Sequence, residues 1–508
     1  MIKENKQFTS NTIYTVINLI IQMGMSFFLT SYLVNTVGST EYGFFTMANN
    51  VVNYALIIAN ALNSLAARFV GIGIHAHDTE KAKRVFSSVF AGNVIFIAIA
   101  LVPSSWAILH LESFIKIPPE LVSDVKLLFV FVFINLCLNV IFAVFGSVYT
   151  IYNRLDLAGG LQAFSNIVKA ALLIAMYIRF EASVVYLGFA TLVATFVVVC
   201  GNIHYTRKYM PKRMFSISLI KISTIIEIVS SGVWNSINQL GVTLLNGLGV
   251  LIANIAVSEQ AMGYLSVASM LPGVVSMCIS TLSNLFTPTF LKLYAEENYT
   301  GLLVETKKSI RFMTVISAIP IAFLISFGIP FIKLWTPNTD IHVVYVLSIL
   351  TLLPNFTGGA INSMNYLYTV ANKVKCQALV LLGTGVINVI LVFILLNTTN
   401  LGVYAVAGVA AVLGFVRNFV FNAPYAAYCI KQPYYIFWLD MGKSVICLIV
   451  VSIIGVIINH ILKPESWIML IISAIVFAII SLIILVLLLL RKEERQEISN
   501  IILKKLKR

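Results

Sequence analysis

Amide side chains recur at helical spacing in two long apolar stretches of this sequence, residues 10–66 and 230–286. With the hydroxyl residues between them they follow steps of three and four, which place them on one helix face. A polar side chain in hydrocarbon is costly unless it faces protein or water, so we expect this face to point inward. The candidate cavity residues are Asn11, Asn18, Gln22, Asn49, Asn53, Asn60, Asn235, Asn238, Asn246 and Asn284.

Two interpretations of these amides remain open. Any single Asn or Ser could hydrogen-bond between packed helices, which is worth about 1 kcal/mol or less. Four polar helix faces in matching positions of two halves instead favour a hydrated cavity between the halves. Uncharged amides and hydroxyls suit an uncharged, hydroxyl-rich cargo such as a sugar.

Two cations lie deep within apolar runs. Lys169 and Arg417 are each about nine residues, or about 13 Å, from a run end, where an unpaired charge costs roughly 2.5–3.5 kcal/mol. They are candidates for an anion site, for instance the pyrophosphate of a lipid-linked substrate. The alternative is that each side chain snorkels or pairs with carbonyl groups. Arg68, at the end of the second run, is a third candidate, or else a charge that only sets topology.

Other chemistry has little support in the sequence. Of the 20 Asp and Glu residues only Glu227 lies inside an apolar run, whereas proton- or sodium-coupled exporters commonly place a carboxylate deep in the membrane. His75 and His77 form a lone HxH that reads better as a solvated turn than as a metal site. The 6 cysteines have no paired spacing, and no glycine-rich nucleotide motif follows a strand. We therefore expect no metal and no cofactor.

The elements that position these residues are membrane helices. The chain has 508 residues, of which 59% are hydrophobic and 11% charged, so we expect an all-α polytopic membrane protein with about 14 transmembrane helices. The first run is too long for a signal peptide and lacks a small-residue cleavage site, so we expect it to be retained. The apolar runs are 11–34, 43–67, 86–110, 125–150, 160–178, 184–204, 224–248, 261–290, 312–333, 342–368, 377–396, 402–428, 443–462 and 467–490.

Basic residues are distributed unequally between the two sides of the predicted membrane. If the N-terminus is cytoplasmic, most of the 34 Lys and Arg residues fall in cytoplasmic segments, including the linker at 204–223 and the tail from Arg491. This predicts that both termini are cytoplasmic. The net charge of +14 then reflects topology and contact with anionic lipid headgroups, not nucleic-acid binding.

The two polar stretches also suggest an internal repeat. At a constant offset of 220 residues, Asn18 aligns with Asn238 and Gly43 with Gly263. We expect two pseudo-symmetric six-helix lobes, an N-lobe at 1–220 and a C-lobe at 221–442. A peripheral, lipid-exposed helix pair and a basic cytoplasmic tail would follow at 443–508.

The N-terminal quarter carries a family resemblance. The run LVNTVGSTEYGFFTMANNVVNYALIIANALNSLAARFV, with its Glu41–Phe44 turn and Arg68, is followed by DTEKAKRVFSS, which holds the Glu80–Arg84 loop. It resembles the polysaccharide flippases, which export O-antigen, capsule and teichoic-type units, within the multidrug/oligosaccharidyl-lipid/polysaccharide exporter superfamily. The resemblance implies two six-helix lobes around a V-shaped cavity that helices one, two, seven and eight line. It also implies that Lys169, Arg417 and Arg68 face a diphosphate.

The resulting hypothesis is a bacterial flippase, not an enzyme, that moves an undecaprenyl-diphosphate-linked oligosaccharide from the cytoplasmic to the outer leaflet by alternating access. Its expected setting is the bacterial cytoplasmic (inner) membrane. Its expected partners are the cargo, the bilayer, and the polysaccharide polymerase and glycosyltransferases of the same pathway. The alternatives are a multidrug or toxin exporter of the same fold and a membrane-embedded polymerase or glycosyltransferase. The first would favour aromatic and acidic cavity groups; the second would need catalytic acids or an Arg-rich external loop.

Overall fold

The computed structural model describes residues 2–283, 286–490 and 494–495, except for the side chains of residues 2–16, 19, 288, 358 and 359. Helices and their connections account for all of this described part. Within it, 11 helices are long and apolar enough to cross a membrane, or 13 spans if each of two bent helix pairs counts as one. The predicted all-α, polytopic class is confirmed. Each predicted run overlaps a helix, but the count of 14 remains a prediction.

The chain forms two compact units. Unit 1 comprises Met1–Val267 and Ala378–Val389, and unit 2 comprises Ala268–Gln377 and Ile390–Arg508. Two helices, α11 (Glu259–Ser283) and α16 (Val374–Thr398), contribute residues to both units. The predicted boundaries at residues 220 and 442 concern the sequence repeat and remain a prediction.

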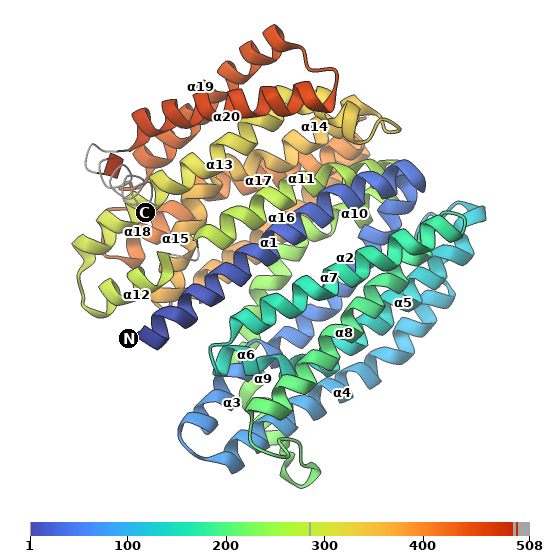
Figure 1. Cartoon of the computed structure of the whole chain (residues 1–508), viewed down its shortest axis with the longest axis vertical. Helices are drawn as coiled ribbons and strands as arrows, with labels where there is room; N and C mark the ends of the chain where they lie inside the picture. The colour runs from blue at the N-terminus through green and yellow to red at the C-terminus, as the bar shows by residue number, and fades with distance from the viewer. Residues whose placement is uncertain (1, 284–285, 491–493, 496–508) are drawn as a thin grey trace. The chain divides into compact units, whose positions relative to one another are not determined.

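Unit 1 is a helical bundle in which α4, α5, α8 and α7 lie side by side, in that order (Figure 1). The helix α1 packs on α7, and α9 packs on α2. Its elements are α1 (Ile2–Thr36), α2 (Ser39–Asn63), α3 (Ala66–His75), α4 (Thr79–Leu109), η1 (Leu111–Ser113), η2 (Pro119–Leu121), α5 (Val122–Ile141), η3 (Ala143–Gly146), α6 (Ser147–Ile151), α7 (Leu155–Arg179), α8 (Val185–Tyr209), η4 (Ile217–Leu219), α9 (Ile222–Val242), η5 (Thr243–Gly247), α10 (Gly249–Ile252) and η6 (Ala253–Val257).

Unit 2 is built around α13, which contacts α12, α14, α15, α19 and α20. The pair α19 and α20 exposes many large apolar side chains, among them Ile461 at 71% and Ile468 at 72%, as expected for helices that face lipid. The unit-2 elements are α12 (Thr287–Ala295), α13 (Tyr299–Trp335), α14 (Ile341–Leu352), η8 (Leu353–Thr357), α15 (Gly358–Val370), α17 (Val403–Arg417), η9 (Asn418–Asn422), α18 (Ala423–Cys429), α19 (Trp438–Leu462) and α20 (Trp467–Leu489).

Local backbone geometry repeats along the chain with the spacing of the sequence repeat. The turn before α4 and the turn before α13 each end in a helix-capping side chain, Asp78 or Asn298, that accepts a bond of 2.8 Å from the backbone N–H three residues later. Three pairs of residues with positive φ also recur at offsets of 218 to 220. These pairs are His77 and Glu297, Asn153 and Asn372, and Arg213 and Lys431.

Helices in the structure continue beyond the apolar runs. The helix α2 begins at Ser39, so Glu41 lies in its first turn and is half-buried. The expectation that Glu227 alone among the acids lies within a membrane helix is therefore wrong, because the candidate span Ser39–His75 begins before the apolar run and includes Glu41. Glu227 itself is exposed in α9.

Candidate functional site

The polar faces of α2 and α9 meet inside unit 1. A Cβ atom placed on Gly232 of α9 would lie 2.0 Å from the carbonyl oxygen of Ala61 in α2, so only glycine permits this backbone approach. Beside this contact, Asn235 Nδ2 donates to Ser64 Oγ at 3.2 Å. The first, second and seventh predicted helices correspond to α1, α2 and α9, and all three lie in unit 1.

The predicted amides differ in exposure. Asn18 is half-buried, and its Oδ1 is buried without a hydrogen-bond partner in the described structure. Asn49 is also half-buried and donates to the Phe45 carbonyl of its own helix at 2.7 Å. Asn60 and Asn238 are half-buried, whereas Gln22, Asn53, Asn235 and Asn246 are exposed. The side chains of Asn11 and Asn284 lie outside the described part of the chain.

Asn246 lies where α9 gives way to a π-helical turn, η5. The segments Ile222–Gly247 and Gly249–Val257 are bent by 41° at this point. Tyr54 donates from its hydroxyl to the Gly247 carbonyl at 2.8 Å, and Asn388 of α16 donates to the Leu244 and Leu245 carbonyls at 3.0 and 3.2 Å. These bonds hold carbonyls of the π-helical turn from two other helices. Single π-helical turns are frequent at functional sites.

Lys169 lies in the span α7 of unit 1 and is half-buried. Its Nζ is 5.5 Å from the ring centroid of Phe45, a cation–π distance. The described residues provide it with neither an ion pair nor a hydrogen bond. A buried ammonium without a carboxylate partner is costly, and an anionic ligand would offset that cost.

Arg417 ends α17 in unit 2 and has a similar environment. It is half-buried, and its Nε and Nη1 are buried without hydrogen-bond partners in the described structure. The next residue, Asn418, begins the π-helical turn η9 and donates to Thr357 Oγ1 at 2.8 Å and to the Pro354 carbonyl at 3.1 Å. The Asn418 amide nitrogen therefore already donates its hydrogen bonds, whereas Nε and Nη1 of Arg417 could donate to an anion.

Arg68 differs from these two cations. It lies in α3 and is exposed. This exposure fits a charge that only sets topology and fits an anion ligand equally well. An apolar pocket of about 220 Å³ in unit 1, between α2, α4 and α5, is lined by none of the predicted site residues.

Sequence reasoning missed the amides that join helices. Asn63 of α2 and Asn93 of α4 exchange two side-chain hydrogen bonds, at 2.9 and 3.0 Å, and Asn93 is fully buried. Asn254 in η6 forms a similar pair of bonds with the backbone N–H and carbonyl of Lys116, at 2.9 and 3.0 Å. Their spacing resembles that of the cavity candidates, so the sequence held no signal that separates the two groups.

The family described as polysaccharide biosynthesis protein matches residues 8–294, which is more than half of the chain. An uncharacterised membrane protein, EpsK, of Bacillus subtilis (strain 168) is 24% identical over 510 residues, covering 99% of this chain and 98% of that protein.

Solved structures show the same fold. The lipid II flippase MurJ in an inward closed conformation matches with a TM-score of 0.67 at 15% identity, covering 98% of this chain and 99% of that one. An inward-facing multidrug resistance transporter of the MATE family matches with a TM-score of 0.58 at 18% identity, covering 84% and 99%. The family match confirms the predicted family resemblance, and these structures share its fold.

Proposed function

Because the chain belongs to the polysaccharide biosynthesis protein family, we propose that it flips an undecaprenyl-diphosphate-linked oligosaccharide from the cytoplasmic to the outer leaflet by alternating access. The setting of this proposal is the bacterial cytoplasmic (inner) membrane, with both termini in the cytoplasm. The polymerase and glycosyltransferases of the same pathway would supply and consume the cargo. The chain itself would carry out no covalent step.

The observation that carries the proposal is the pair of half-buried cations in membrane spans. The Lys169 ammonium lies 5.5 Å from the Phe45 ring centroid and has no ion pair or hydrogen bond within the described residues. Arg417 has two buried nitrogens without partners in the same part of the chain. A diphosphate is the anion that such groups would bind, since charged phosphate oxygens accept strong hydrogen bonds from ammonium and guanidinium groups. We propose that each cation binds diphosphate at a stage of transport, and that Arg68 serves the entering substrate.

The neutral amides support the glycan part of the proposal. Sugars present hydroxyl groups that both donate and accept hydrogen bonds, and amides can do the same. In unit 1 the half-buried residues Asn18, Asn60 and Asn238 are proposed to line the glycan path. The unpartnered Asn18 Oδ1 is the acceptor most in need of a donor. The remaining candidates are the exposed Gln22, Asn53, Asn235 and Asn246, the self-bonded Asn49, and Asn11 and Asn284.

The test is complementation of a strain that lacks this gene. The variant Lys169→Ala with Arg417→Ala should abolish surface polysaccharide while lipid-linked oligosaccharide accumulates in the membrane. Single alanine variants should each lower export by about 10-fold or more, since a hydrogen bond to a charged group contributes about 1.5–3 kcal/mol.

The matched control is Lys169→Arg with Arg417→Lys, which keeps both charges and should retain part of the export. Immunoblots of membranes must show equal protein for all variants. Wild-type export by the double alanine variant would refute the anion-site proposal.

A further inference from the structure

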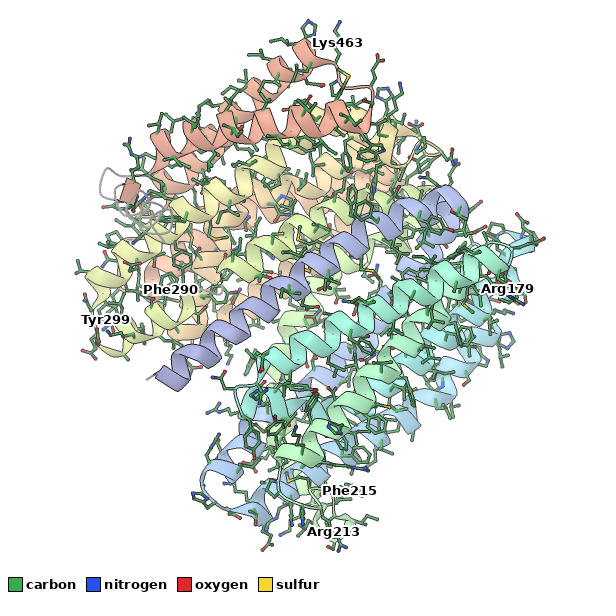
Figure 2. The ribbon with its side chains drawn as sticks, in the orientation of Figure 1. Arg179, Arg213, Phe215, Phe290, Tyr299 and Lys463 are labelled. Carbon is green, nitrogen blue, oxygen red and sulfur yellow. The ribbon has the colours of Figure 1, made fainter. Side chains whose placement is uncertain are left out.

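The segment between α8 and α9 forms a wall of a pocket in unit 1. The pocket has a volume of about 590 Å³ and lies at the end of α8, against α4 and η3. Figure 2 shows Arg213 and Phe215 at this end of the unit and Arg179 of α7 at the opposite end. Because α8 is a candidate span, the pocket lies at the level of one membrane–water interface.

Hydrogen bonds hold the wall segment in place. The fully buried hydroxyl of Ser87 in α4 accepts from the Ser216 N–H at 2.9 Å and donates to the Met214 carbonyl at 3.4 Å. The Ser88 hydroxyl accepts from the Lys221 N–H at 3.1 Å. Met214 is itself buried, so the segment packs as part of the bundle and presents a fixed surface.

The inner wall of the pocket is aromatic. The rings of Phe86 and Phe145 lie 5.0 Å apart, and those of Phe142 and Phe145 lie 5.7 Å apart. Phe215 of the linker stacks edge-on against Phe90 at 5.1 Å and is 42% exposed. Such a wall suits a hydrocarbon chain and repels a small hydrated ion.

The rim of the pocket is basic. Arg207, in the last turn of α8, and Lys212 and Arg213, in the linker, line the pocket and are exposed. The described residues give none of the three an ion pair or a side-chain hydrogen bond. Arg213 also adopts a left-handed backbone with φ 57°, which is uncommon for a residue with a side chain.

We propose that this pocket binds an anionic phospholipid, with its phosphodiester on the three cations and its acyl chain along the phenyl rings. An anionic phospholipid is the ligand that a leaflet presents at the level where α8 ends, and clusters of Lys and Arg beside a span are the groups that bind it. The site is separate from the proposed cargo cations, since none of Lys169, Arg417 and Arg68 lines it. The bound lipid would anchor the linker between α8 and α9 at the membrane surface.

The test uses the purified full-length protein and native mass spectrometry. We expect dioleoyl phosphatidylglycerol to bind saturably and dioleoyl phosphatidylcholine to bind more weakly. Replacing Arg207, Lys212 and Arg213 by Gln should weaken phosphatidylglycerol binding by about 5-fold per cation, or on the order of 100-fold in the triple variant. Because all three side chains are exposed, the triple variant should remain folded and monodisperse.

The matched control replaces three other basic residues of unit 1 by Gln: Lys81, Lys83 and Lys208. None of them lines the pocket, so phosphatidylglycerol binding should change by less than about 2-fold. If both triple variants lost phosphatidylglycerol affinity equally, the loss would be due to net charge alone, which would overturn the proposal. So would wild-type binding by the pocket variant, or an equal affinity of the protein for inorganic phosphate alone.

Discussion

Gly43 and Gly263, which lie 220 residues apart, pack against each other in unit 1. A Cβ atom on Gly43 would lie 3.0 Å from the Cα of Gly263, and one on Gly263 would lie 2.6 Å from the Ser39 carbonyl oxygen. When two copies of a unit are related by a two-fold axis, equivalent residues touch one another only near that axis. The predicted repeat, if its axis passes near this contact, would bring these two equivalent positions together; the repeat itself remains a prediction.

This contact predicts a stability cost for any side chain at Gly263. Gly263→Ala should destabilise the protein by about 1–3 kcal/mol, because backbone atoms rather than a flexible side chain occupy the space. The measurement is the thermal unfolding midpoint in detergent. Gly24→Ala in α1 is the control, since nothing lies within 4 Å of the added carbon there. Equal midpoints for the two variants would contradict the close approach.

The Asn63 and Asn93 pair tests the distinction between helix contacts and cavity lining. Asn63→Leu leaves the fully buried Asn93 amide without its partner and should lose about 1–3 kcal/mol. Asn93→Leu should lose less, because the half-buried Asn63 keeps its bond to the Ala59 carbonyl at 3.0 Å. The double variant should be nearly as stable as the wild type, because both polar groups are then gone. Unfolding midpoints and polysaccharide export should be measured together. If export fell in the double variant while stability held, the pair would belong to the transport path.

Much of the fold followed from the sequence because hydrophobicity alone determines which segments can cross a bilayer. Every predicted apolar run overlaps a helix, and the Asp78 cap and the turn at His77 lie where the polar loop was expected. The π-helical turns η5 and η9 were not predicted, because the bonds that satisfy their backbone come from distant residues such as Asn388.

The candidate site was less accessible to sequence reasoning. An amide at helical spacing looks the same whether it bonds to a neighbouring helix, as Asn63 does, or leaves an oxygen unpartnered, as Asn18 does. Only tertiary packing separates the two. The sequence also does not show which basic residues form buried ion pairs. Arg311 looks like one of many topology-setting residues until its partner is known.

Arg311 in α13 forms a buried ion pair with Glu494, which follows the last span. Its Nε donates to Glu494 Oε2 at 3.1 Å and its Nη2 donates to Oε1, and both side chains are buried. Arg311→Ala should cost up to about 3–5 kcal/mol, because it removes the guanidinium that binds the buried Glu494 carboxylate in two hydrogen bonds. The unfolding midpoint in detergent measures this loss.

An exposed ion pair in the same unit provides the control. Lys292 of α12 and Glu296, which follows this helix, lie 3.9 Å apart, with side chains 74% and 52% exposed. Lys292→Ala should change stability by less than about 1 kcal/mol. A similar loss in both variants would show that the Arg311 pair is not buried in solution.

The central claim is that this chain moves a lipid-linked oligosaccharide across a membrane, and reconstitution tests it most directly. The purified protein would be placed in vesicles with a polyprenyl-diphosphate-linked oligosaccharide in the inner leaflet, and an added glycosidase would report the fraction of glycan reaching the outside. We predict that the wild type exposes the glycan over time and that the Lys169→Ala, Arg417→Ala variant does not. Glycan that stays protected with the wild type, in vesicles that nevertheless transport a cationic drug, would contradict the account.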